Sequence, residues 1–232
     1  MEIDLNADLG EGAGTDAGLI PLISSANISC GAHAGDETTI RATIHLAVQQ
    51  HIIIGAHPGY EDRANFGRVT LPEPPAALLD QLILQVKQLA NWIERAGSKL
   101  QYIKPHGALY NQAGTDTRFA KIVCDLAKSF ALPVMGLPES ELEDVCLMNG
   151  QPFISEGFAD RRYNPDGTLV PRTEPNAILH DVAEVVEQVK WITDRERVRS
   201  ICVHGDTSDA VKFTAAVRDE LLKQGFTIKA FV

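Results

Sequence analysis

Several features that define familiar protein classes are missing from this sequence. It has no run of about 18 apolar residues, which excludes a membrane-spanning helix of the usual kind. Its first residues, MEIDLNADLG, lack the basic region and apolar stretch of a signal peptide, and we therefore expect a cytoplasmic protein. Positive charge is scarce, with 21 Lys and Arg against 31 Asp and Glu and a formal net charge of −10. This balance disfavours nucleic acids and anionic membranes as partners.

Compact motifs for nucleotides, metals and disulfides are missing as well. No GxxxxGKS or GxxxxGKT string occurs, so the chain has no P-loop, and no HExxH motif marks a zinc site. The start of the chain is similar to a calcium loop, but Leu9 and Thr15 stand where such a loop needs glycine and glutamate. The four cysteines form no CxxC pair, which predicts reduced thiols. They are Cys30, Cys124, Cys146 and Cys202.

Strand-like and helix-like segments alternate along all 232 residues, and no linker or repeat divides them. Hydrophobic residues make up 44% of the chain, which is enough for one core, and we expect a single domain over residues 1–232. Repeated strand–helix units predict an α/β fold with a parallel sheet. The expected strands are residues 3–8, 27–32, 52–56, 101–105, 133–136, 152–156, 200–204 and 227–231. The expected helices are residues 36–50, 75–96, 115–129, 140–150, 176–193 and 208–223.

Four histidines follow apolar, strand-like runs, and each has a glycine within the next two residues. They are His33 in NISCGAHAGD, His57 in IIIGAHPGY, His106 in YIKPHGALY and His204 in SICVHGD. This pattern places a side chain at the carboxyl end of a strand, where α/β enzymes build active sites. We therefore expect one shared pocket. The other three histidines, His45, His51 and His180, lie in or beside helical patterns and are interpreted as structural.

The first strand adds polar side chains to the same place. Asp4, Asn6 and Asp8 alternate with apolar residues and share one strand face. In a parallel barrel this face lines the interior, where carboxylates need partners, a metal or a substrate. The less demanding alternative is a strand with its polar face in water. Asp8, His33 and His57 are the candidate ligands of a divalent transition metal, and general acid–base catalysis by histidine is the competing hypothesis.

Two connections, residues 57–74 and 157–175, are too long to be simple turns, and both are rich in arginine. Arginine suits a carboxylate or phosphate. Arg63 and Arg161 are the candidate anchors for an anionic substrate, together with Lys104 near a strand end. Alternatively, Lys104 is buried and paired with an acid, and Glu156 and Asp160 are the candidate partners. These two acids can equally be catalytic carboxylates.

The same segments resemble the LamB/YcsF family, and within it the A subunits of prokaryotic ATP-dependent 5-oxoprolinases. The motifs are DLNADLGEG, ANISCGAHAGD, GAHPGYEDRANFGR, KPHGALYN, EGFADRRYNPDGTLVPR and VHGD, in this order over nearly the whole chain. The resemblance implies an irregular parallel (β/α) barrel of seven or eight strands. It also implies opening of 5-oxo-L-proline to L-glutamate at the expense of ATP, together with separately encoded B and C subunits. ATP then binds either at this rim, at an interface or on a partner.

These observations define the expected site. The candidate catalytic residues are Asp8, His33, His57, His106, Glu156 and His204. The candidate substrate-binding residues are Asn6, Arg63, Lys104, Asp160 and Arg161. A stand-alone metal-dependent deacetylase or amidohydrolase on the same barrel is the alternative activity. A non-enzymatic binding protein is disfavoured, because binding alone does not need so many titratable groups at one rim.

Overall fold

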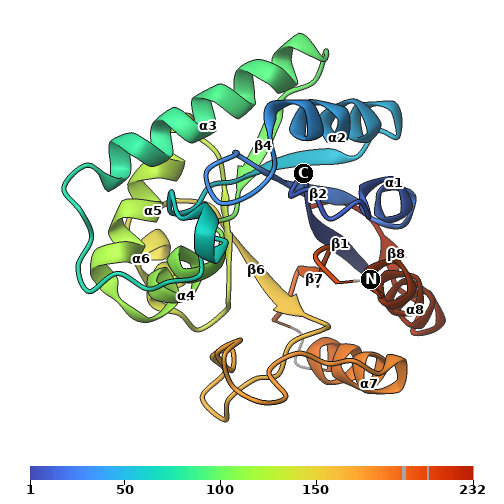
Figure 1. Ribbon diagram of the computed structural model, residues 1–232. Coiled ribbons are helices and arrows are strands. Elements are labelled where there is room, and N and C mark those ends of the chain that lie inside the picture. Colours follow the sequence, from blue (N-terminus) through green and yellow to red (C-terminus); the bar gives the residue numbers. More distant parts are fainter. Residues whose placement is uncertain (195–196, 208, 232) are drawn as a thin grey trace.

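Eight parallel strands form one sheet in the computed structural model of the protein, which describes residues 1–194, 197–207 and 209–231 (Figure 1). The strands are β1 (Glu2–Leu9), β2 (Ser25–Ser29), β3 (Ile53–His57), β4 (Leu100–Ile103), β5 (Val134–Gly136), β6 (Phe153–Phe158), β7 (Ser200–His204) and β8 (Thr227–Ile228). Strands β1 to β7 close into a barrel, because β1 pairs with β7 on one side and β2 on the other. β8 pairs with Glu2 and Ile3, before the residues of β1 that pair with β7. The predicted barrel is confirmed, with seven strands in the ring and an eighth at its edge.

The barrel is irregular around β4. The register between β3 and β4 shifts between Ile54 and Gly55, and β4 pairs with β5 through Ile103 and Val134. A Cβ atom on Gly55 would lie 2.2 Å from Cε2 of Tyr102. Glycine is therefore required at this position to admit the Tyr102 ring, which is completely buried.

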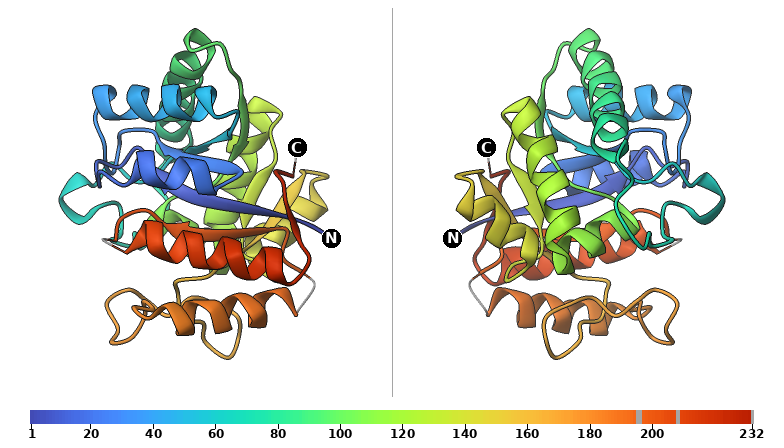
Figure 2. Two further views of the ribbon diagram at one scale, coloured as in Figure 1. Left: turned by 90° about the vertical axis from the view of Figure 1, so that its right-hand side faces the viewer. Right: turned by 90° about the vertical axis from the view of Figure 1, so that its left-hand side faces the viewer.

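Helices cover the outside of the barrel (Figure 2). They are α1 (Asp16–Leu19), α2 (Glu37–Gln49), α3 (Leu78–Arg95), α4 (Gly107–Thr115), α5 (Thr117–Phe130), α6 (Glu141–Met148), α7 (Val182–Thr193) and α8 (Ala210–Lys223), with short 3-10 turns at Ile20–Leu22 and Arg63–Asn65. All six predicted helices are present, although α7 begins later than predicted. The Asp181 carboxylate caps α7 by accepting hydrogen bonds from the backbone N–H groups of Ala183 and Glu184, and this fixes where the helix begins. α1 and α4 were not predicted. Residue 208, the first of the last predicted helix, lies outside the described residues.

Side-chain alternation on β1 divides the barrel wall into an apolar outer face and a polar inner face. Leu5, Ala7 and Leu9 are fully buried in the apolar core between strands and helices. Helix α3 presents Leu82, Val86, Leu89 and Ile93 to the same core, spaced at three and four residues. This packing fixes the direction of the polar residues of β1, which therefore point into the barrel.

The lower part of the barrel interior is polar and closely hydrogen-bonded. The Asp4 carboxylate accepts from the hydroxyls of Ser24 (2.6 Å), Ser25 (2.7 Å) and Ser200. Asn27 accepts from the Tyr102 hydroxyl at 2.5 Å. These bonds satisfy groups that would be costly to bury alone, and they provide a fixed floor for the residues nearer the rim.

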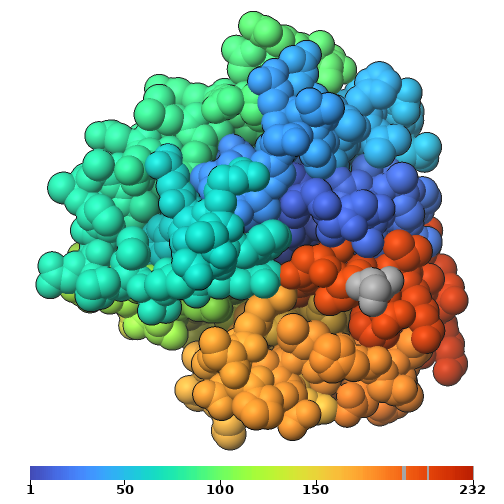
Figure 3. Space-filling model, in the orientation of Figure 1, coloured from blue at the N-terminus to red at the C-terminus, as the bar shows by residue number. Residues whose placement is uncertain are grey.

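The two long connections lie at the carboxyl ends of the strands. The first runs from β3 to α3, and the second runs from β6 to α7 and is braced by antiparallel bridges between Arg161 and Ile178 and between Tyr163 and Leu169. On the face shown in Figure 3, the first connection borders the segments that follow β1 and β7. In the part of the chain that the structure describes, no helix is long and apolar enough to cross a membrane.

Candidate active site

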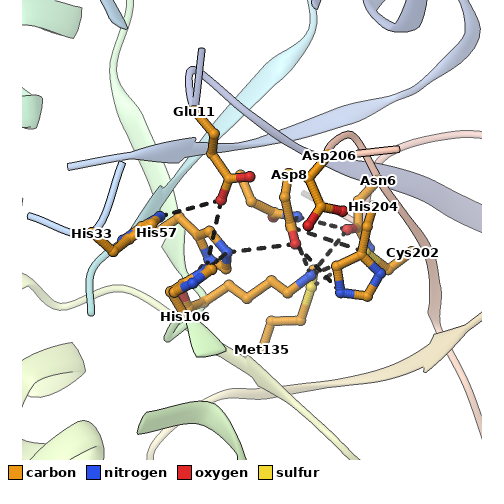
Figure 4. Close-up of polar contacts among 12 residues, drawn as sticks. Asn6, Asp8, Glu11, His33, His57, His106, Met135, Cys202, His204 and Asp206 are labelled. Atoms are coloured by element: carbon orange, nitrogen blue, oxygen red, sulfur yellow. Dashed lines mark hydrogen bonds and ion pairs between the residues drawn. The ribbon is translucent and has the colours of Figure 1, made fainter. Parts of the chain in front are cut away.

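The four predicted histidines lie at the same end of the barrel. His57 and His204 are the last residues of β3 and β7, and His33 and His106 follow β2 and β4. Figure 4 shows His33, His57 and His106 gathered on one side of Asp8, with His204 on the other side. The expected convergence of the strand-end residues is therefore present in the structure.

Lys104 lies at the centre of this arrangement, one residue beyond β4 and only 1% exposed. Its ammonium group is 3.0 Å from Asp8 Oδ1 and 2.8 Å from Glu156 Oε1. Burial alone would lower the pKa of Lys104, but these carboxylates, Asp8 first, hold it well above the usual value. Burial would raise the pKa of Asp8, but Lys104 and His57 hold it well below the usual range. Lys104 and Asp8 are therefore a buried, charged pair.

Asn6 and Glu156 belong to the layer beneath the rim. Asn6 Nδ2 donates to Glu156 Oε1 at 3.0 Å and to the Ser200 hydroxyl at 2.7 Å, and Asn6 Oδ1 accepts from Asn27 at 2.6 Å. Burial raises the pKa of Glu156 despite the nearby Lys104 ammonium. Both residues are completely buried. Through these contacts, Asn6 and Glu156 help to position Lys104 and Asp8. The geometry gives no support for the predicted contact of Asn6 with substrate.

The tautomers of His57 and His106 follow from their backbone partners. His57 Nδ1 lies 2.8 Å from the Lys104 carbonyl, and His106 Nε2 lies 2.8 Å from the Phe66 carbonyl. A carbonyl only accepts, so each of these nitrogens carries the proton. The other nitrogens, His57 Nε2 and His106 Nδ1, then face one another at 3.1 Å as lone pairs when both rings are neutral. Two lone pairs at this distance need a proton or a cation between or beside them.

Glu11 and His33 complete a cluster of potential metal ligands. Glu11 Oε1 is 3.2 Å from His33 Nε2 and 3.6 Å from His106 Nδ1. Ligand atoms about 2.0–2.2 Å from a tetrahedral Zn²⁺ lie roughly 3.3 Å apart, which matches these spacings. Burial and neighbouring histidines lower the pKa of His33 and His106 well below the usual value, and neutral imidazole is the form that binds metals. The residues present therefore fit a divalent transition metal.

This cluster differs from the metal set predicted from the sequence. Among the described residues, the group whose ligand atoms all lie within 4.8 Å of one another is Glu11, His33 and His106. Asp8 is instead paired with Lys104, and His57 lies beside the cluster. The prediction missed Glu11 because it follows β1 in a glycine-rich turn, where the strand alternation that selected Asp8 no longer applies.

The segment around Phe66 holds the histidine rings in place. The His33 and His106 rings stack at 3.6 Å between centroids with an interplanar angle of 2°, and the Phe66 ring packs against both. Gly67 has a φ of +64°, and a Cβ atom there would lie 2.9 Å from Cβ of His33. Only glycine combines this backbone conformation with this close approach.

His204 and Asp160 form a second unit on the opposite side of Asp8. The His204 Nδ1 atom is 2.9 Å from Asp160 Oδ1, and Nε2 is 3.8 Å from Asp8 Oδ2. Burial would raise the pKa of Asp160, but His204 outweighs this effect and keeps it below the usual value. A carboxylate that holds Nδ1 leaves Nε2 free to exchange a proton, as in catalytic dyads. Asp160, predicted to bind substrate, is therefore placed to orient His204.

The arginines predicted to anchor the substrate have other partners. Arg161 is 4% exposed and donates to the carbonyls of Val170 at 2.6 Å and Ala177 at 3.3 Å, within its own connection. Arg63 donates to the Gly31 carbonyl at 2.7 Å and lines a separate cavity of about 350 Å³ with Cys30 and Trp92. The structure thus places neither arginine among the rim histidines.

Two other arginines reach the rim instead. Arg68 and Arg172 come from the two long connections and both pair with Asp206, which follows β7. The VHGD motif contains Asp206, but nothing in the sequence indicated which arginines it pairs with. The four cysteines are free and buried. Cys202 Sγ lies 3.1 Å from the Lys104 ammonium.

Comparison with known proteins gives matches over nearly the entire chain. The sequence profile of the LamB/YcsF family matches residues 3–232. The crystal structure of a lactam utilization protein from Thermus thermophilus superposes with a TM-score of 0.90 and 32% identity, covering 100% of both chains.

More distant structures share the fold. A putative cellobiose-phosphate cleavage protein from Enterococcus faecalis has 12% identity and a TM-score of 0.62, covering 99% of this chain and 96% of its own. The catalytic domain of a peptidoglycan N-acetylglucosamine deacetylase from Eubacterium rectale has 12% identity and a TM-score of 0.55, covering 99% of this chain and 88% of its own. At this level of identity, the two structures support the barrel assignment alone.

Proposed function

Because the chain belongs to the LamB/YcsF family, we propose that it is the hydrolytic subunit of an ATP-dependent 5-oxoprolinase. The reaction converts 5-oxo-L-proline, ATP and two water molecules into L-glutamate, ADP and phosphate. The name of the Thermus thermophilus relative, a lactam utilization protein, supports a lactam as the substrate class. The observation that carries the proposal is the arrangement of two chemically different units around Asp8: the His204–Asp160 pair and the cluster of Glu11, His33 and His106.

Ring opening of a lactam needs a polarised carbonyl, a water nucleophile and a proton for the leaving nitrogen. His204 suits the proton transfer, because Asp160 holds its Nδ1 atom and leaves Nε2 facing Asp8. Its side chain is 12% exposed, so a substrate can reach it. His57 offers Nε2 as a proton acceptor 3.5 Å from Asp8 Oδ2. In this proposal His204 protonates the ring nitrogen, and His57 accepts the proton of the attacking water.

Glu11, His33 and His106 would hold a divalent transition metal. Such an ion supplies a Lewis acid that polarises an oxygen and lowers the pKa of bound water. Around it, the carbonyls of Phe66 and Lys104 fix the tautomers of His106 and His57, which is the usual support for metal-binding imidazoles. Lys104 balances the charge of Asp8 beneath the cluster.

ATP is assigned to a partner subunit in this proposal. The sequence contains no GxxxxGKS or GxxxxGKT loop, which is the usual cradle for the phosphates of a nucleotide. We therefore propose that separately encoded B and C subunits bind ATP and activate the lactam, in the cytoplasm where ATP is available.

The activity is tested with the purified chain, alone and combined with its candidate B and C subunits. We expect glutamate to form from 5-oxo-L-proline and ATP in the full mixture, and little or none with the chain alone. His204→Asn should reduce kcat of the full mixture by about 10²–10⁴-fold, whereas His45→Asn, on the exposed face of α2, serves as the matched control. Hydrolysis of simple amides by the lone chain without ATP would instead support the deacetylase or amidohydrolase alternative.

The metal is tested independently of activity. Elemental analysis of the purified chain should find about one divalent transition metal ion per chain, and Zn²⁺ titration of chelator-treated protein should show one site. Glu11→Gln and His106→Gln should each weaken Zn²⁺ binding by at least tenfold, and Asp8→Asn should do so less. Equal Zn²⁺ affinity in the wild-type chain and both cluster variants would contradict the ligand assignment.

A further inference from the structure

We infer that Arg68 and Arg172 form a carboxylate-binding subsite at the rim and hold the carboxylate of the substrate. This inference rests on the proposed function for the identity of the lactam, but not for the existence of the subsite. Arg68 belongs to the β3–α3 connection and Arg172 to the β6–α7 connection, so segments about 100 residues apart in sequence meet here. Both guanidinium groups contact Oδ2 of Asp206, Arg68 at 2.5 Å and Arg172 at 3.0 Å.

The two arginines have unused hydrogen-bonding capacity. A guanidinium group carries five N–H donors. Among the described residues, the hydrogen bonds of the Arg68 and Arg172 side chains are those to Asp206, one from each. Their side chains are 34% and 19% exposed, so solvent reaches the remaining donors. Paired N–H groups of this kind match the geometry of a carboxylate.

Asp206 is the acid that both guanidinium groups contact. Burial would raise the pKa of Asp206, but Arg172, His204 and Arg68 keep it below the usual value, so the carboxylate is ionised. One carboxylate is therefore shared by two guanidinium groups. Arg63, by contrast, contacts the Gly31 carbonyl and lines the separate cavity, and Arg161 is buried among the carbonyls of its own connection. Arg68 and Arg172 are therefore the two arginines placed to receive an anion at the rim.

The subsite adjoins the proposed reaction centre. Arg68 directly follows Gly67, which packs on His33 and His106, and its guanidinium carbon lies 4.5 Å from the centroid of the Phe66 ring. Asp206 lies two residues after His204, and Figure 4 shows Asp206 above His204, on the side of Asp8 away from His33. In 5-oxo-L-proline the carboxylate is attached to a carbon bonded to the lactam nitrogen. A carboxylate on Arg68 and Arg172 therefore directs that nitrogen toward His204.

The experiment measures binding to the purified chain by calorimetry with three probes. 5-Oxo-L-proline carries both the lactam and the carboxylate, 2-pyrrolidinone carries the lactam alone, and cyclopentanecarboxylate carries the carboxylate alone. Arg68→Met and Arg172→Met should each weaken binding of both carboxylates by about 10- to 100-fold, the range for a hydrogen bond to a charged group. Binding of 2-pyrrolidinone should not change. Arg63→Met, which removes a bond to Gly31, should leave all three affinities unchanged.

The outcomes separate the subsite from the proposed function. Arginine-dependent binding of cyclopentanecarboxylate, with no binding of 5-oxo-L-proline, supports the subsite and contradicts the lactam substrate. Unchanged affinity of 5-oxo-L-proline in both methionine variants overturns the subsite, as does failure of the wild-type chain to bind either carboxylate. Arg68→Lys and Arg172→Lys guard against local unfolding: each retains the charge, and should bind carboxylates more tightly than the methionine variant.

Discussion

Replacing Lys104 by methionine tests whether the buried charges hold the barrel interior together. The substitution matches the aliphatic part of the side chain but leaves the Asp8 and Glu156 carboxylates, 3.0 and 2.8 Å from the ammonium group, without their shared partner. Lys104 is only 1% exposed, so water cannot easily replace it. Loss of one partner from a buried ion pair costs about 3–5 kcal/mol, and we expect Lys104→Met to lower the free energy of unfolding by that amount.

Reversible urea denaturation at pH 7, followed by circular dichroism, measures this change. Lys87→Met, on the exposed side of α3, is the control and should change stability by no more than about 0.5 kcal/mol. Adding Glu156→Gln to Lys104→Met should restore at least about 1 kcal/mol, because it removes one of the two unpaired carboxylates. The reasoning is refuted if Lys104→Met alone costs less than about 1 kcal/mol.

Three further predictions concern other parts of the structure. Val86→Ala removes two methyl groups from the buried face of α3 and should cost about 1–3 kcal/mol in urea denaturation; no loss would contradict the packing described. Burial raises the pKa of Asp4 to about 6 from 3.8, so the folded state binds more protons than the unfolded state between these values. The stability of the wild-type chain relative to Asp4→Asn should therefore fall by about 2–2.5 kcal/mol as pH rises from 4 to 7.5. A pH-independent difference would exclude this titration. Gly67→Ala should displace His33 and weaken Zn²⁺ binding at least tenfold; unchanged affinity would show that the close approach of Gly67 does not position the ring.

The sequence predicted the fold well because the barrel depends on local patterns. Alternation on β1 correctly placed Asp4, Asn6 and Asp8 inside, and the three- and four-residue spacing identified α3. The helix boundaries were less accurate where a cap determined them, as at Asp181. Helix α4 was missed because it is short and follows His106 without a turn.

The composition of the site was harder to predict than its location. A histidine at the end of a strand is visible in the sequence, so the convergence of His57 and His204 was expected. Contacts between loops are not visible in this way, because they depend on how distant connections fold over the rim. The pairing of Arg68 and Arg172 with Asp206 is of this kind. Glu11 was missed because it lies in the turn after β1, where strand alternation no longer applies. Arg161 was assigned to substrate although it braces its own loop.

A crystal structure of the chain with 5-oxo-L-proline bound tests the central claim most directly. We predict that the lactam lies between His204 Nε2 and the cluster of Glu11, His33 and His106, with its carboxylate on Arg68 and Arg172. An ordered ligand that lies away from these residues, for example in the cavity lined by Cys30 and Arg63, would show that the proposed site is wrong.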